Sequence, residues 1–502
     1  MKRNFRIISL ICAAAMTMLM LAGCGSGSST EASNTSAAES TAAVSTDDGG
    51  YKQASAADAP TLVWWQIGTQ PQNLAQGVEK INEYTAEKYG VKVDIKVAGW
   101  GDYETKMNTI VNTGEKFDIM FVNNNNYNLF VNMGAFEDIT DMVQKEAPEL
   151  FKFIPEKVWN GTRLDGKIYS VPTYKDSSST QYYVWDDAIV KKYNIDYANI
   201  KTMQDLDKPF RAIKAGEGKS YYPLRMTKDD GFSATFIDYD DLTLGFKPIG
   251  VKLDDGSRKV VSVLEQPDIM ERLKLLHQWY KDGISNPDAP TQGEVPKGKP
   301  FFTAQAFPGA EASWQINEGV EKYVMTQVYG PMYTTSSIQG SLNAVSSSSE
   351  HKIEALKFLQ AVNTDSKLRN LLAYGIEGEN WQTVSDNVIK KLNDTWSLPA
   401  YSQGTFFNLA AVDPNPANQW EAVKALNEQA TASVTLGYAI NIKELSTEVA
   451  NCKAVWDKYK FELQTGASDP EVMVPKIINE LKAAGMDTII QKAQEQITEY
   501  FK

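Results

Sequence analysis

Hydrophobic and polar positions follow two alternating periods from about residue 60 onward. TLVWWQI is a short apolar run that predicts a strand, and LAQGVEKINEYTAEKYG spaces its apolar residues like an amphipathic helix ending at a glycine. VKVDIKVAGW alternates as a second strand, DYETKMNTIVNTGEK predicts a second helix, and FDIMFV predicts a third strand. This order of elements predicts an α/β fold with a largely parallel sheet.

Two tryptophans, Trp64 and Trp65, stand side by side near the end of the first predicted strand. Successive side chains of a strand point to opposite faces, so both indoles cannot be buried on one side of a sheet. We interpret one as a core residue and the other as the wall of a ligand cleft. Trp65 leads into the following loop and is the favoured ligand residue.

Ligands of parallel sheets bind beyond the carboxyl ends of the strands. The loops GTQPQN and NNNNYN follow two of the predicted strands, and Trp100 follows the third. The amides of an asparagine run offer both donors and acceptors to a ligand, although a solvated loop that uses asparagine for its turns is the alternative. The candidate ligand residues of these loops are Thr69, Gln70, Trp100, Asn123, Asn124 and Asn125.

Four further candidates are open between ligand contact and a structural role. Trp314, in FPGAEASWQ, and Trp381, after GIEGEN, are both expected on loops. Tyr174 follows VPT and is a candidate for the hinge or the cleft. Glu377 either accepts hydrogen bonds from ligand hydroxyls or stabilises the turn in which it lies.

The first residues have the pattern of a secretory signal. MKRNFR is basic, an apolar stretch follows, and LAGC ends it with small residues before a cysteine, which resembles a bacterial lipobox. We expect a signal peptide at 1–23, acylation of Cys24, and a flexible Ser/Ala/Gly-rich tether at 24–59. A plain signal peptide or a transmembrane helix is the alternative.

Length, charge and the motifs that are missing argue against several classes of function. The 502 residues suffice for two or three domains, and a net charge of −13 repels nucleic acid and anionic membrane surfaces. Removal of Cys12 and acylation of Cys24 would leave Cys452 without a disulfide partner. The sequence has two histidines and no HExxH, GxSxG or zinc-binding pattern, so we expect no enzyme, cofactor or metal. A solvated loop is favoured over calcium binding for the acidic run DYDD at 238–241.

Several segments resemble the family 1 extracellular solute-binding proteins, which are the receptors of ABC-type sugar importers. They include AGWGDYETKMNTIVNTGEKFDIMFVNN, LDGKIYSVP and the stretch SLNAVSSSSEHKIEALKFLQAVNTDSKLRNLLAYGIEGENW. The last stretch and the tail, which begins TLGYAINIKELSTEVANCKAVWDKYKFELQTG, are similar to a long lipoprotein branch of Gram-positive bacteria.

The resemblance implies two α/β lobes joined by hinge strands, with the ligand bound in the cleft between them. The first lobe is expected at 60–172, completed by about 304–350. The second is expected at 173–303, completed by about 351–400, and 401–502 is expected to extend it with helices.

The resemblance also implies a monomer, anchored on the extracellular face of the membrane, that delivers a carbohydrate to an ABC permease. A carbohydrate suits the candidate residues, because a pyranose needs flat aromatic walls for its C–H faces and placed polar groups for its hydroxyls. The long branch of the family implies an oligosaccharide rather than a monosaccharide. The same fold with a peptide or polyamine as ligand is the alternative, and a surface glycosidase is less favoured.

Overall fold

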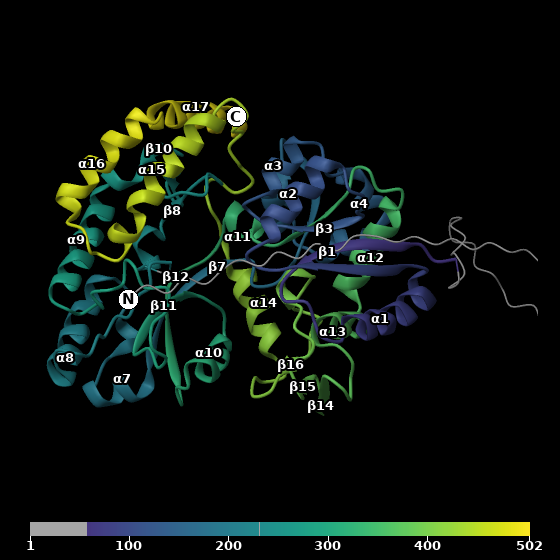
Figure 1. Cartoon of the computed structure of the whole chain (residues 1–502), viewed down its shortest axis with the longest axis horizontal. Coiled ribbons are helices and arrows are strands. Elements are labelled where there is room, and N and C mark those ends of the chain that lie inside the picture. The colour runs from purple at the N-terminus through teal and green to yellow at the C-terminus, as the bar shows by residue number, and fades with distance from the viewer. Residues whose placement is uncertain (1–57, 230) are drawn as a thin grey trace, which may run out of the picture. The chain divides into compact units, whose positions relative to one another are not determined.

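The computed structural model describes residues 58–229 and 231–502. The expected signal peptide, the acylation of Cys24 and nearly all of the expected tether lie outside the described residues. Within the described part, no helix is long and apolar enough to cross a membrane. Helices and strands alternate there, as the sequence predicts, in a mixed α/β fold (Figure 1).

The first sheet has five strands in the order β2-β1-β3-β13-β6. Strand β1 pairs in parallel with both β2 and β3, which confirms the three predicted strands, while β13 runs antiparallel to β3 and β6. The bounds are β1 (Thr61–Ile67), β2 (Lys92–Ala98), β3 (Ile119–Val122), β6 (Ser170–Pro172) and β13 (Leu342–Val345).

Helices cover both faces of this sheet. Trp64 packs in a core with Phe358 of α12, whereas Trp65 packs in another core with Tyr103 and Met107 of α2. Figure 1 shows α2 and α3 above the strands and α1 and α13 below them. The bounds of these helices are α1 (Leu74–Tyr89), α2 (Tyr103–Thr113), α3 (Tyr127–Asn132), α12 (Lys352–Thr364) and α13 (Ser366–Tyr374).

Four short helices and a two-stranded hairpin complete this half of the molecule. The hairpin pairs β4 with β5 directly after α6. The bounds are α4 (Thr140–Glu146), α5 (Pro148–Phe153), α6 (Glu156–Thr162), β4 (Arg163–Leu164), β5 (Lys167–Ile168) and α14 (Gln419–Gln429).

The second sheet has four strands in the order β11-β7-β12-β17. Trp185 of β7 and Phe301 of β11 pack on Phe210 and Trp279 from the helices on one face, and α10 contacts the other face. The bounds are β7 (Ser179–Asp186), α7 (Asp187–Tyr193), α8 (Asp207–Glu217), α9 (Pro267–Lys281), β11 (Phe301–Gln305), α10 (Ala310–Glu318), β12 (Tyr323–Tyr333) and β17 (Thr431–Ala432).

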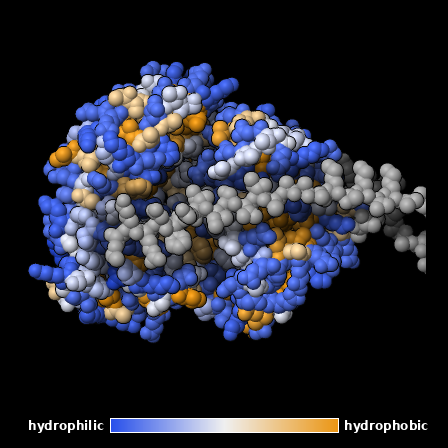
Figure 2. Space-filling view, in the orientation of Figure 1, coloured by the Kyte–Doolittle hydropathy of each residue, from blue (hydrophilic) through white to orange (hydrophobic). Residues whose placement is uncertain are grey.

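The tail of the chain forms three long helices that pack on a small three-stranded sheet. Cys452 is fully buried in this core beside Trp456, where it serves as a small apolar residue. The bounds are β8 (Tyr239–Asp240), β9 (Ile249–Lys252), β10 (Val260–Ser262), α15 (Ser446–Gln464), α16 (Pro470–Ala483) and α17 (Met486–Tyr500). Figure 2 shows a mostly hydrophilic surface over the visible parts of this face.

Three segments connect the two halves, and we call 173–178, 334–341 and 430–437 the hinge segments. The second contains α11 (Thr335–Gln339). Ser337 Oγ donates a hydrogen bond to the Ser177 carbonyl at 2.8 Å, and the Ser433 amide donates to the Tyr333 carbonyl at 2.8 Å. The Gly437 amide donates to Thr335 Oγ1 at 3.0 Å, so the three segments are bonded to one another.

The packing differs from the expected lobe boundaries in three places. Residues 401–429 belong to the first half, because Phe406 and Trp420 pack with Tyr374 of α13, although 401–502 was expected to extend the second lobe. Residues 351–374 belong to the first sheet, because the apolar face of α12 packs against Trp64, although 351–400 was expected to complete the second lobe. Residues 304–333 belong mainly to the second sheet, because β12 pairs with β7 along most of its length. Sequence pattern alone does not reveal which sheet a helix or strand joins when the chain crosses more than once.

A small sheet of β14 (Trp381–Ser385), β15 (Val388–Lys391) and β16 (Ala411–Val412) follows α13. Its apolar residues form a core with Tyr374, Phe406 and the partly buried Trp420. This small sheet is joined to the first half, since Asn73 Nδ2, just before α1, donates to Asn380 Oδ1 at 3.3 Å.

Candidate functional site

The carboxyl ends of β1, β2 and β3 lie at one edge of the first sheet, because these strands run in parallel. We call the loops that follow them, 68–73, 99–102 and 123–126, the carboxyl edge. The edge meets the hinge, since Asn124 Nδ2 donates to the Ser336 carbonyl at 3.0 Å. The structure therefore brings the predicted residues of three separate loops to one place.

Trp100 is the most exposed large aromatic residue of this edge, at 54% of its surface. Its ring stacks on Tyr401, with 6.3 Å between centroids and 26° between planes. Tyr401 in turn packs edge-on against Phe121 of β3, at 6.1 Å. Trp100 and Tyr401 form an aromatic platform at the carboxyl edge, and flat, exposed rings of this kind suit the apolar face of a sugar.

The loop that carries Tyr401 is fixed by a buried guanidinium. Arg369 of α13 is fully buried and donates to the Thr405 carbonyl at 2.7 Å, the Gln403 side chain at 2.7 Å and the Ala400 carbonyl at 2.6 Å. Burial lowers the pKa of Arg369 to about 10. Sequence reasoning missed Tyr401, because its place beside Trp100 depends on these contacts between distant segments.

The asparagine run is organised by one carboxylate. Glu104 accepts hydrogen bonds from the side-chain amides of Asn123 at 3.3 Å, Asn125 at 3.4 Å and Asn126 at 3.0 Å. Asn124 Oδ1 is buried and has no hydrogen-bond partner within the described residues. Most of the run therefore shapes its own loop, and Asn124 Oδ1 is an unpaired acceptor buried beside the hinge.

The tryptophan pair of β1 has a packing role. Trp64 has no exposed surface, and its indole donates to Asn343 Oδ1 at 2.9 Å. Trp65 is 8% exposed and lies under α2, with Lys106 Nζ 5.3 Å from its ring centroid. The interpretation of Trp65 as a cleft wall differs from this placement, because helices on both faces of the sheet bury both indoles.

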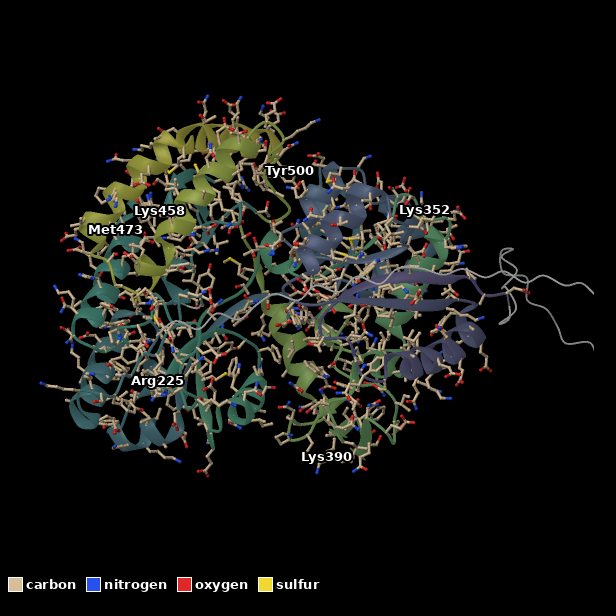
Figure 3. The ribbon with its side chains drawn as sticks, viewed as in Figure 1. Arg225, Lys352, Lys390, Lys458, Met473 and Tyr500 are labelled. Atoms are coloured by element: carbon tan, nitrogen blue, oxygen red, sulfur yellow. The ribbon has the colours of Figure 1, made fainter. Side chains whose placement is uncertain are left out.

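Trp314 lies on α10 and not on the expected loop. It packs edge-on against Phe302 at 5.1 Å and lines a pocket of about 280 Å³ on the second sheet. The pocket also contains Arg225, which Figure 3 labels, together with Ser233 and Thr303. Trp314 is thus the predicted ligand residue that lies in the second half of the molecule, where it lines a pocket together with polar side chains.

Three other candidates, Tyr174, Trp381 and Glu377, make contacts within the fold that give each of them a structural role. Tyr174 is buried between Phe153 and Phe407 at the start of a hinge segment, and Trp381 begins β14 rather than a loop, with its indole bonded to the Gly375 carbonyl at 2.9 Å. The Glu377 carboxylate accepts a hydrogen bond from Thr383 at 2.8 Å within its own turn.

Thr69 and Gln70 are exposed at the carboxyl edge. The Thr69 carbonyl accepts a hydrogen bond from Ser397 Oγ at 3.1 Å, which ties this loop to the segment before Tyr401. Their side chains are therefore beside the aromatic platform on a loop that is held in place.

The three aspartates of the acidic run at 238–241 interact with other side chains of the protein. Asp238 pairs with Arg272, and Asp241 pairs with Lys247 at 3.3 Å. Asp240 is buried and accepts a hydrogen bond from Thr435 at 2.5 Å, and its burial raises its pKa to about 6. Among the described residues, no group of three or more His, Cys, Asp or Glu side chains is arranged to hold a metal ion.

Two α/β lobes joined by three hinge segments, with an aromatic platform beside the hinge, define the class of two-lobe ligand receptors. The sequence comparison agrees, because residues 68–367 match the bacterial extracellular solute-binding protein family. The chain belongs to this family. Residues 434–502 match a further family, DUF3502, described as a domain of unknown function.

Relatives cover nearly the whole chain. A carbohydrate ABC transporter substrate-binding protein of Streptococcus pneumoniae is 27% identical over 468 residues, which are 90% of this chain and 93% of the relative. The crystal structure of the N-glycan transport solute binding protein NgtS from the same species is 25% identical, with a TM-score of 0.79 over 88% of this chain and 99% of that chain.

Two complexes of NgtS match less closely. The TM-score is 0.72 for the complex with Man1GlcNAc and 0.68 for the complex with Man5GlcNAc, each over 88% of this chain. An HMO-binding solute-binding protein from Bifidobacterium longum infantis, 16% identical with a TM-score of 0.61 over 88% of this chain and 99% of that chain, shares the fold.

Proposed function

We propose that this protein is a receptor that captures an oligosaccharide between its lobes and delivers it to the permease of an ABC importer. The aromatic platform is the observation that carries the proposal, because the exposed ring of Trp100, stacked on the partly buried Tyr401, offers a flat apolar surface beside the asparagine loop, as sugar binding requires. The similarity to NgtS and to a carbohydrate transporter protein supports a sugar as the ligand.

The ligand contacts we propose come from both lobes. The platform supplies a flat apolar wall, and Asn124 supplies an unpaired carbonyl oxygen that a sugar hydroxyl reaches once the side chain turns outward from its buried position. Thr69, Gln70, Asn123 and Asn125 border these groups on the first lobe. Trp314 supplies an aromatic wall from the second lobe.

We expect the two lobes to close on the sugar, because the proposed ligand contacts come from both of them. A ligand shifts an equilibrium between open and closed states only through its higher affinity for the closed state, and contacts from both lobes provide that difference.

The receptor role includes membrane attachment through acylated Cys24, on the extracellular face, as a monomer. We expect the protein to bind and deliver its ligand without catalysis. A glycosidase needs two carboxyl groups placed across the scissile bond, and the carboxylate nearest the amide loop, Glu104, is engaged by three asparagine side chains.

A thermal-unfolding screen tests this function. The full chain in a detergent without a sugar headgroup is heated with Man1GlcNAc, Man5GlcNAc, other oligosaccharides, peptides and polyamines. A ligand at 100 times its Kd stabilises a protein by about 2.7 kcal/mol, which raises the midpoint measurably. We expect an oligosaccharide to raise the midpoint, and a shift caused only by peptides or polyamines would contradict the proposal.

A further inference from the structure

A second cavity between the lobes has no role in the site described above. It measures about 700 Å³ and lies between α3 and the β4–β5 hairpin on one side and residues 437–445 and α17 on the other. Figure 3 labels Tyr500, a residue of this cavity, at the end of α17. One wall therefore comes from the first lobe, and the other comes from 434–502, which we call the C-terminal unit.

The charges that line the cavity balance. Three cationic and three anionic side chains line it, and both signs occur on both walls, so the lining as a whole has no net charge that would favour a strongly charged ligand. These residues are Arg163, Lys443, Lys492, Asp165, Glu444 and Glu499. A phosphorylated ligand or a polyamine would meet as many repulsive as attractive groups, whereas a neutral, hydrogen-bonding ligand meets donors and acceptors.

Aromatic rings and amides make up much of the remaining lining. Tyr169 and Tyr500 present rings from opposite walls, and Tyr500 is 42% exposed although its hydroxyl is fixed on the Gly437 carbonyl at 2.9 Å. Gln496 is also held in place, because its Oε1 accepts from the Asn441 amide at 2.9 Å and its Nε2 donates to the Asn441 carbonyl at 3.0 Å, which leaves the second N–H of Nε2 for a ligand. Preset rings and amides are the groups that bind polyhydroxylated molecules.

One segment of the chain connects the carboxyl edge to the cavity. Helix α3 starts directly after the asparagine loop, and Asn128 and Asn132 line the cavity one helical turn apart, at a rise of about 6 Å. Asn128 Nδ2 also donates to the Ile440 carbonyl of the C-terminal unit at 3.1 Å. A single segment, 123–132, thus leads from the amides of the carboxyl edge to the cavity.

We propose that this cavity is a second carbohydrate subsite, which holds the far part of a long or branched glycan whose near part lies on the aromatic platform. The inference rests on the proposed carbohydrate function and gives the C-terminal unit a role in selecting glycan length. A short glycan fills the platform alone, so only a long glycan gains affinity from the cavity.

The test compares Man1GlcNAc and Man5GlcNAc by calorimetry on the full chain. Thr488 is an exposed cavity residue of α17, and Thr488→Trp would place a bulky indole in the cavity. We expect this variant to weaken Man5GlcNAc at least about tenfold and to change Man1GlcNAc by less than about twofold. Gln491→Trp is the matched control, because Gln491 is exposed on the same helix outside the cavity, and it should change neither affinity.

Asn132→Ala, on the opposite wall, provides a second variant that adds no bulk. It should also weaken Man5GlcNAc selectively, and thermal unfolding of both variants verifies that they are folded. Equal effects on the two glycans, or no effect on either, would overturn the subsite while leaving the receptor function intact. A wild-type chain that binds neither glycan would overturn the proposed function for these sugars, and the subsite with it.

Discussion

The interior of the first sheet and its carboxyl edge both carry tryptophan, with opposite consequences. Trp64 in β1 has no exposed surface, whereas Trp100, just beyond β2, exposes about half of its surface. The difference arises because helices cover both faces of the sheet but leave the ends of its strands open. Aromatic residues within the strands therefore stabilise the fold, and those beyond the strand ends are available to a ligand.

Replacing Trp64 tests the interior most strongly. Trp64→Ala removes a fully buried indole and the shorter of two hydrogen bonds to Asn343 Oδ1, so we expect the free energy of unfolding to fall by about 3–5 kcal/mol. Denaturant titration measures the loss. Glycan affinity, measured well below the unfolding midpoint, should be unchanged, and a large loss of affinity in a folded variant would contradict the division between interior and edge.

Asp240 tests how the interior of the second lobe responds to pH. Its folded pKa of about 6 lies above its ordinary value of 3.8, so the native state binds the proton more tightly than the unfolded state. Its contribution to stability is therefore complete below about pH 4 and is lost as pH rises through 6, by up to about 3 kcal/mol.

The comparison with Asp240→Asn isolates this effect from other carboxyl groups. The stability difference between variant and wild type, from urea unfolding at several pH values, should favour the variant increasingly from pH 4 to 7. A difference that is flat over this range would show that Asp240 does not titrate as its burial requires.

Arg369 connects the interior to the edge. Arg369→Met leaves several buried carbonyl oxygens of the Tyr401 loop without donors, so we expect a loss of about 2–3 kcal/mol in stability and a weaker affinity for glycans. Parallel measurement of unfolding and glycan binding checks both effects. A loss of stability with unchanged affinity would mean that Tyr401 is placed without Arg369.

Trp100→Ala should reduce glycan affinity and leave stability nearly unchanged, whereas Trp64→Ala should do the opposite. The exposed indole contributes little to the fold, so stability should change by less than about 0.5 kcal/mol. Loss of stacking and burial should weaken glycan binding by about 1–3 kcal/mol. Calorimetry measures the affinity, and an unchanged affinity would remove Trp100 from the site.

Sequence reasoning predicted the fold better than the site. The periods of the first three strands and two helices predicted the parallel sheet, and the order of the loops placed Trp100 and the asparagine run at one edge. The burial of Trp65 was not predictable, because it depends on helix α2 packing over its face of the sheet. Tyr401 was missed for a related reason, since it reaches the edge through contacts of Arg369 with a loop more than 30 residues away.

The carbohydrate-receptor function is tested most directly by calorimetric titration of Man5GlcNAc into the full wild-type chain, followed by mass spectrometry of the recovered glycan. We expect saturable binding of one glycan per chain and recovery of the glycan intact. Failure of this and other oligosaccharides to bind, or recovery of a cleaved glycan, would contradict this function.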